Sequence, residues 1–213
     1  MFDPTKDEGV PLNVWLFNQD PPPTGAQLRR LLADRLIETY CPPSGVVVDL
    51  DPDGGEVLAA AASAGRSTAA VPPICACPAQ RHQRTLEGLR ASADLVVVLP
   101  RASRLVPPRP HALSPVTLSQ LCRRSTALLR PGGFLVLGVV ESAPAGAGHP
   151  LADAVHAAAP EGLAYFQHLV AVAATDLVDS TPASAIRGCG GPLRGGDRTA
   201  AHIDLLVLSR RGQ

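Results

Sequence analysis

The sequence contains few aromatic residues, almost no lysine and no surplus of charge of either sign. Phe, Trp and Tyr together make up 3% of the 213 residues, so the core has to be built from Ala, Val and Leu. Lys plus Arg number 19, as do Asp plus Glu, and Lys6 is the only lysine. A net charge of zero excludes a global field that would attract nucleic acid or an anionic membrane.

Long apolar runs and a regular cysteine pattern are also absent from the sequence. No run reaches the roughly 18 apolar residues of a membrane span, and the acidic N-terminus does not resemble a signal peptide. The five cysteines are an odd number without the spacing of a disulfide framework. Residues 75–77 (Cys-Ala-Cys) lack a second pair of metal ligands. We therefore expect reduced thiols in a cytoplasmic protein, with no membrane partner and no metal.

What the sequence does contain is a regular alternation of strands and helices. Residues 46–48 are a continuous β-branched run, typical of a parallel strand covered on both faces, and residues 94–99 and 134–140 are two further buried strands of mostly apolar residues. Further strands are predicted at 67–71, 164–174 and 202–209, and helices at 24–40, 56–64, 78–90, 115–129 and 151–159. This alternation predicts a single Rossmann-like α/β domain over residues 24–213, with a doubly wound, mostly parallel sheet.

Residues 1–23 are polar and rich in proline, apart from an apolar patch at residues 14–17 (Val-Trp-Leu-Phe). We expect an irregular N-terminal arm here. Its patch either docks on the body, as a strap over the sheet edge or the cleft, or binds a partner. Residues 175–198 contain many glycines and no clear element, which predicts a long loop.

Residues 45–72 read as a strand, a Gly-containing turn, an Ala-rich helix and a second strand. This is the opening β-α-β unit of a nucleotide-binding sheet, whose ligands bind at the carboxyl ends of the strands. GVVVDLDPDGGEVLAAAASAGR resembles the first motif of class I S-adenosylmethionine (SAM) methyltransferases, in particular DNA amino-methyltransferases. RLIETY resembles their motif ten, ADLVVVLPRA their catalytic motif and LLRPGGFLVLGVV the helix, turn and strand that follow. GLAYFQHLVAVAA with HIDLLVLSR resembles their closing antiparallel hairpin.

The resemblance implies a SAM pocket in which several residues are altered. Asp49 matches the acidic residue at the end of the family's first strand. Asp53, Gly54 and Gly55 stand where the family has Gly-Ser-Gly, so a carboxylate replaces the first glycine close to the methionine carboxylate of the cofactor. Pro72 stands where a Glu or Asp of the family grips the ribose hydroxyls, and proline offers no such hydrogen bond.

The carboxylates of Asp49, Asp51 and Asp53 leave two interpretations open. They form a vestigial or altered ligand pocket, in which Asp51 or Asp53 replaces the missing ribose acid from another direction. Alternatively, they form a solvated acidic turn that favours the positive end of the helix beginning at Glu56. The stretch 72–93 is also short, with room for one helix and at most a stub strand at 74–77. Whether the family's third strand exists therefore stays open.

The catalytic tetrad of the family, [Asp/Asn/Ser]-Pro-Pro-[Tyr/Phe/Trp], stands here as Leu99, Pro100, Arg101 and Ala102. The resemblance implies that the first side chain and a backbone carbonyl accept hydrogen bonds from the target amine, and that the ring stacks on the flipped base. Leu99 has no polar side chain to accept such a bond, and Ala102 has no ring. The tetrad is degenerate, and we expect no catalytic residue in it.

Together these changes predict a methyltransferase-like protein without cofactor that acts as a non-catalytic binding, scaffolding or regulatory module. Its expected partner is a protein, which includes a second copy of the chain. One alternative is an active SAM-dependent methyltransferase with an atypical pocket. Another is a non-catalytic nucleic-acid-binding protein, in which Arg101, Arg104 and Arg109 contact phosphates together with Arg123 and Arg124 of the next helix. The same loop arginines also fit a solvated loop.

Overall fold

The computed structural model describes residues 12–19, 23, 25–71, 87–99, 115–139, 150–174 and 201–212. Its strands are β1 (Leu12–Asn18), β2 (Val46–Asp49), β3 (Ser67–Ala70), β4 (Ala93–Val98), β5 (Leu129–Val139), β6 (Leu163–Ala174) and β7 (Ala201–Arg210). Its helices are α1 (Gly25–Tyr40), α2 (Glu56–Ser63), α4 (Pro115–Leu128) and α5 (Pro150–Ala158), with short 3₁₀ helices η1 (Pro52–Gly54) and η3 (Ala159–Glu161).

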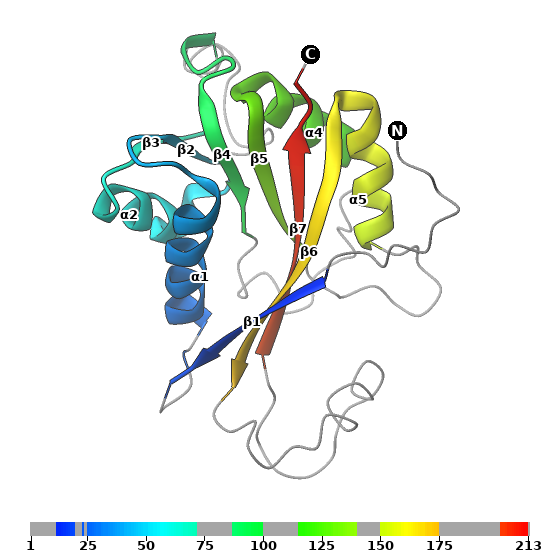
Figure 1. Ribbon diagram of the computed structural model, residues 1–213. Coiled ribbons are helices and arrows are strands. Elements are labelled where there is room, and N and C mark those ends of the chain that lie inside the picture. Colours follow the sequence, from blue (N-terminus) through cyan, green and yellow to red (C-terminus); the bar gives the residue numbers. More distant parts are fainter. Residues whose placement is uncertain are drawn as a thin grey trace.

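The strands form one sheet in the order β1-β6-β7-β5-β4-β2-β3 (Figure 1). Every neighbouring pair is parallel except those of β7, which runs antiparallel to both β5 and β6. The predicted Rossmann-like sheet with its antiparallel C-terminal hairpin is therefore confirmed. The chain has the class I methyltransferase-like fold, and the strand ends that would bind a ligand lie where β2 and β4 are neighbours.

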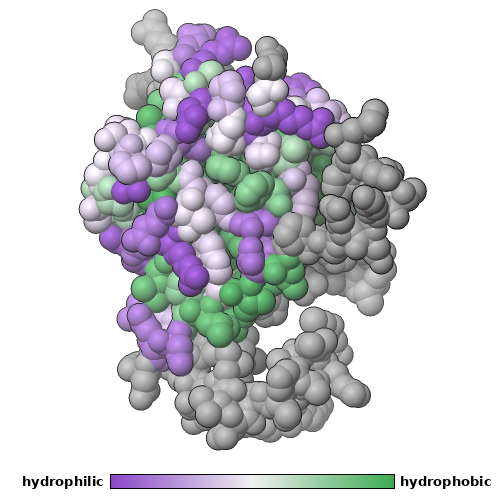
Figure 2. All heavy atoms as spheres, in the orientation of Figure 1, coloured by the Kyte–Doolittle hydropathy of each residue, from purple (hydrophilic) through white to green (hydrophobic). Residues whose placement is uncertain are grey.

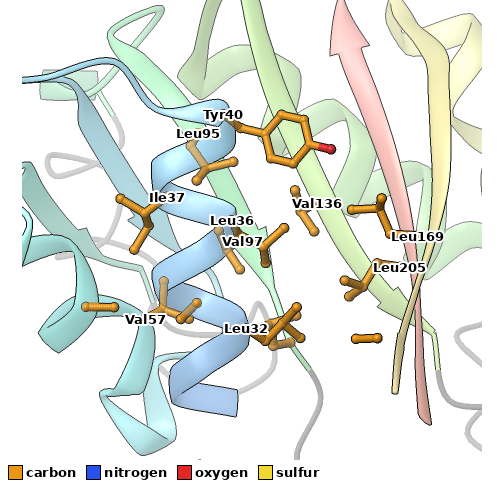
Figure 3. Close-up of a cluster of buried hydrophobic side chains, with 14 of the residues drawn as sticks. Leu32, Leu36, Ile37, Tyr40, Val57, Leu95, Val97, Val136, Leu169 and Leu205 are labelled. Atoms are coloured by element: carbon orange, nitrogen blue, oxygen red, sulfur yellow. The ribbon is translucent and has the colours of Figure 1, made fainter. Parts of the chain in front are cut away.

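Two apolar layers cover the central strands, one on each face of the sheet. Successive side chains of a strand point to opposite faces, so Val47, Leu95 and Val97 pack with α1 and α2, whereas Val48 and Val96 pack with α4 and α5. Figure 3 shows the first layer, in which side chains of α1 point toward those of β4, β5, β6 and β7. This double covering explains why β2 and β4 read as uninterrupted β-branched and apolar runs.

The aromatic residues of the described part of the chain gather in the half of the sheet that holds β1, β5 and β6. The rings of Tyr40, Phe134 and Phe166 form a cluster. The distance between ring centroids is 5.2 Å for Tyr40 and Phe134 and 5.2 Å for Phe134 and Phe166. Burial raises the pKa of Tyr40 to about 12. Trp15 and Phe17 of β1 are buried in the same layer. These rings pack in a part of the core that is separate from the ends of β2 and β4.

The apolar patch of residues 14–17 is part of a strand, and the expectation of an irregular arm is wrong for residues 12–18. β1 pairs in parallel with β6, from Leu12 opposite His168 to Asn18 opposite Ala174. Trp15 is only 8% exposed and carries the guanidinium of Arg35 4.7 Å from its ring centroid. The patch therefore lies on the sheet edge, paired with β6, and the structure does not test whether it also binds a partner.

Several expectations fall outside the described residues. These are residues 78–86 of the helix expected at 78–90, the stub strand at 74–77 and the loop at 175–198. On the side of the sheet opposite to β1, β3 is the last strand in the part of the chain that the structure describes. No helix among the described residues is long and apolar enough to cross a membrane.

Replacing Trp15 by Ala tests how β1 is held. The substitution removes a buried ring and its cation–π contact, and we expect a loss of about 3 kcal/mol in the free energy of unfolding. Asn13→Ala is the matched control on the same strand, because Asn13 is exposed and only its amide contacts Gln167. It should cost less than about 1 kcal/mol. Equal losses in urea unfolding would show that β1 is not anchored through Trp15.

Candidate ligand site at the ends of β2 and β4

The candidate site begins where β2 and β4 end and the chain turns toward α2. Backbone bonds extend the ladder past the strands, because the Leu50 amide donates to the Val97 carbonyl (3.0 Å) and the Val71 amide to the Asp49 carbonyl (2.9 Å). Pro52 then opens η1, as its fixed φ suits the first position of a helical turn. The turn thus follows directly from a rigid strand end, which is what positions a ligand site precisely on an α/β sheet.

Two glycines of the turn have different roles. Gly55 has φ of +71°, a conformation that glycine adopts without strain, and an added Cβ there would meet nothing within 4 Å. Gly54 instead lies beneath the carboxylate of Glu56, which a Cβ on Gly54 would collide with. The turn therefore has a glycine at position 55, as the motif that the sequence resembles does. The space above Gly54 is occupied by the side chain of Glu56.

Two of the predicted acidic residues are buried at this turn. Asp49 is 2% exposed, and its Oδ1 accepts a hydrogen bond from the Asp51 amide at 2.9 Å. Burial raises the pKa of Asp49 to about 6, with smaller contributions from the charges of Asp51 and Glu56. Asp51 is 9% exposed, and among the described residues its Oδ1 has no hydrogen-bond partner. Asp49 and Asp51 therefore do not belong to a solvated turn, and none of the described side chains caps α2.

A buried arginine connects the ends of the two strands. Arg29 of α1 donates from Nη1 to the Leu99 carbonyl at 2.6 Å, and its Nε lies 3.8 Å from Glu56 Oε1. The side chain of Leu99 is 2% exposed and belongs to the apolar layer under α1. Leu99 stands at the position of the polar acceptor in the catalytic motif that the sequence resembles. Its side chain is part of the core, and its carbonyl already accepts a hydrogen bond from Arg29.

Arg29 and Glu56 were not predicted as site residues. A signal for Arg29 was present, because it lies between Leu28 and Leu32 on the apolar face of α1, where a charge needs a buried partner. Glu56 was interpreted only as the start of a helix. Its Oε2 is buried and has no hydrogen-bond partner in the described part of the chain.

The structure brings together Asp49, Asp51, Gly54, Gly55 and Leu99 of the predicted site. Asp53 lies in η1, but its side chain is not described. The remaining predicted positions fall outside the described residues: Pro72, Pro100, Arg101, Ala102, Arg104 and Arg109. Within the described ranges, no group of three His, Cys, Asp or Glu side chains is arranged to hold a metal ion.

The helix arginines proposed for nucleic acid are partly engaged elsewhere. Arg123 pairs with Glu161 of η3 at 3.0 Å, although its side chain is 73% exposed. Burial lowers the pKa of Arg124. Arg123 is thus paired and Arg124 is half-buried, and the loop that would complete a cationic surface lies outside the described residues.

No protein-family model and no curated protein matches the chain. Solved structures do match it. The 1,6-didemethyltoxoflavin-N1-methyltransferase of Burkholderia thailandensis, solved with 1,6-didemethyltoxoflavin and S-adenosylhomocysteine, has a TM-score of 0.50 and 16% identity, covering 86% of this chain and 78% of that one. A SAM-dependent methyltransferase from Methanosarcina mazei has a TM-score of 0.49 and 12% identity, covering 84% and 98%.

A third match is the release factor-specific protein-(glutamine-N5) methyltransferase of Alicyclobacillus acidocaldarius, with a TM-score of 0.44 and 18% identity, covering 87% and 93%. By their names, the first of these neighbours acts on 1,6-didemethyltoxoflavin and the third on glutamine in a protein. At 16% identity the likeness to the first structure shows the fold alone, which is that of class I SAM-dependent methyltransferases.

Asp49→Asn should stabilise the protein in a pH-dependent way. The pKa of Asp49 is raised from 3.8 to about 6, so between these values the folded protein holds a proton that the unfolded chain has released. Stability therefore falls as the pH rises through this window and stays lower above it. Asn keeps the acceptor for the Asp51 amide and removes the buried charge. We expect a gain on the order of 2 kcal/mol at pH 8 that disappears near pH 4.

Thermal unfolding at the two pH values measures this effect. Asp153→Asn on α5 is the control, because Asp153 is exposed and should give the same small change at both. A loss of stability for Asp49→Asn at pH 8 would show that the ionised carboxylate is satisfied by groups not described here.

Proposed function

We propose that this chain is a non-catalytic, cytoplasmic binding, scaffolding or regulatory module that retains the class I methyltransferase-like fold. The observation that carries the proposal is the pairing of Arg29 with the Leu99 carbonyl and with Glu56. The protein's own side chains and backbone thereby occupy the strand ends at which a methyltransferase of this fold holds its ligands.

The absence of a catalytic acceptor supports the proposal from the reaction side. An amine that receives a methyl group has to be oriented by hydrogen bonds to a positioned acceptor. At the first tetrad position Leu99 has no polar side-chain atom, and its carbonyl accepts from Arg29. No aromatic ring is buried at these strand ends among the described residues, so a stacking platform for a base is not found there.

The space at the turn supports the proposal from the cofactor side. The carboxylates of Asp49, Asp51 and Glu56 lie around the turn that would receive the methionine portion of SAM. They repel its carboxylate and attract its ammonium group, so charge alone does not decide whether SAM binds. Glu56 also fills the space over Gly54. A relation to DNA amino-methyltransferases in particular is part of the proposal and is supported by the order of the motifs in the sequence.

One observation favours the alternative of an active SAM-dependent methyltransferase with an atypical pocket. Asp51 Oδ1 and Glu56 Oε2 are buried without a hydrogen-bond partner among the described residues. Unpaired buried acceptors are costly, and the amino group of a bound ligand would satisfy them. Direct binding measurements separate the two functions.

Calorimetry with SAM and S-adenosylhomocysteine is the deciding experiment. We expect dissociation constants weaker than ~100 μM, that is, less than about 5.5 kcal/mol of binding free energy. Values in the low micromolar range would contradict the non-catalytic function. Glu56→Ala should tighten binding several-fold by vacating the space over Gly54, and Glu38→Ala on the exposed face of α1 is its control. Asp53→Gly combined with Pro72→Glu restores the family residues and should tighten it further.

No methyl group should be transferred to DNA. Incubation with labelled SAM and mixed-sequence DNA is expected to give the same incorporation as a sample without protein, because Leu99 cannot accept a hydrogen bond from adenine or cytosine. Incorporation above that background would refute the prediction. In that case Leu99→Ala distinguishes the sites, since activity that survives it arises from residues other than the tetrad.

A further inference from the structure

β1 presents an uncovered apolar row at the edge of the sheet. The side chains of Leu12, Val14 and Leu16 are 56%, 54% and 50% exposed, and they are three of the four large apolar side chains exposed among the described residues. Figure 2 shows hydrophobic residues gathered over β1, in the lower centre of the view. β1 is also the last strand on its side, so one edge of its backbone has no strand partner among the described residues.

Within residues 12–18, this edge lacks the charge, the proline and the bulge that normally prevent strand pairing between molecules. Edge strands are usually kept apart by charged residues, proline or a bulge. Residues 12–18 (Leu-Asn-Val-Trp-Leu-Phe-Asn) contain no charge and no proline, and β1 pairs with β6 over seven residues without a register shift. An edge with this composition is expected to be covered in solution.

The apolar surface continues from β1 across the neighbouring strand. Val14 and Leu16 lie opposite Val170 and Val172 of β6, both of which are only partly buried. Leu12 lies opposite His168 of β6. His168, together with Leu151 and Val155 of α5, lines an open groove of about 420 Å³. The helix covers one end of this face, and the end at β1 stays exposed.

We propose that β1 is a homodimer interface, in which the strand pairs antiparallel with β1 of a second copy of this chain. A two-fold axis brings the same patch of both copies together, and a strand without charge can meet its own copy without repulsion. The chain as a whole has zero net charge, so no long-range field opposes the encounter. Nothing charged in residues 12–18 would attract a nucleic acid or a charged peptide to this edge.

The register follows from matching apolar side chains. With Val14 opposite Val14 of the second copy, Leu12 lies opposite Leu16 on both sides of the axis, and all six side chains share one face because strands alternate with period two. Two seven-residue edges with this face form a small interface compared with the roughly 800 Å² per partner of a stable dimer. The dimer should therefore form at micromolar rather than nanomolar concentration.

Sedimentation equilibrium of the full chain between ~1 and ~100 μM tests the proposal. The mean mass should rise from 22.1 kDa toward twice that value with concentration. Val14→Lys should remain monomeric throughout this range, because it places like charges opposite each other at the axis. Thr68→Lys is the matched control, since Thr68 is exposed on β3 at the opposite edge of the sheet, and it should dimerise as the unaltered chain does.

Disulfide trapping provides a second measurement if Val14→Lys does not fold. Under mild oxidation Val14→Cys should give a covalent dimer well above the level of the unaltered chain, whose native cysteines set the background, and Thr68→Cys should not. A monomer at every concentration, or dimerisation unaffected by Val14→Lys, would overturn the proposal. So would a monomer whose β1 edge pairs only with a different protein. Because β1 lies at the far edge from β2 and β4, this result is independent of SAM binding.

Discussion

The buried guanidinium of Arg29 is the interaction on which the arrangement of the candidate site depends. It joins three elements that are separate in the sequence, namely α1, the end of β4 at Leu99 and the start of α2 at Glu56. A buried charge is stable only when it is paired and hydrogen-bonded, so these partners and the arginine require one another. The pairing holds the strand ends together at the edge of the sheet where open α/β sheets bind their ligands.

The order of elements was predictable from the sequence because each is encoded locally. The valine run of β2, the helical spacing of leucines in α1 and the glycine of positive φ at Gly55 all have local causes. The contacts of the site were harder to predict from the sequence. Arg29 and Leu99 are 70 residues apart, and no periodicity of the sequence indicates a hydrogen bond between them. β1 was misread for a similar reason, since its alternation is set in a Pro-rich stretch and its partner β6 lies at the other end of the sequence.

Asp49 shows how far the site departs from what folding alone would select. A carboxylate that is 2% exposed and whose pKa is raised by burial makes the folded state less stable at neutral pH than a neutral residue of the same shape would. Residues of this kind are typical of functional sites, although ion-pair networks of purely structural origin also produce them. The turn thus combines this buried acidic position with two neighbours, Asp51 and Glu56, whose charges raise the pKa of Asp49 further.

The pairing of β1 with β6 has a consequence for folding during synthesis. β1 leaves the ribosome long before its hydrogen-bonding partner β6, because all the other strands of the sheet except β7 lie between them in the sequence. Such a non-local parallel contact raises the contact order and slows folding. An uncharged, β-prone heptapeptide that waits in an extended state is open to aggregation. Expression yield should therefore depend on translation speed and on chaperones that bind short apolar segments.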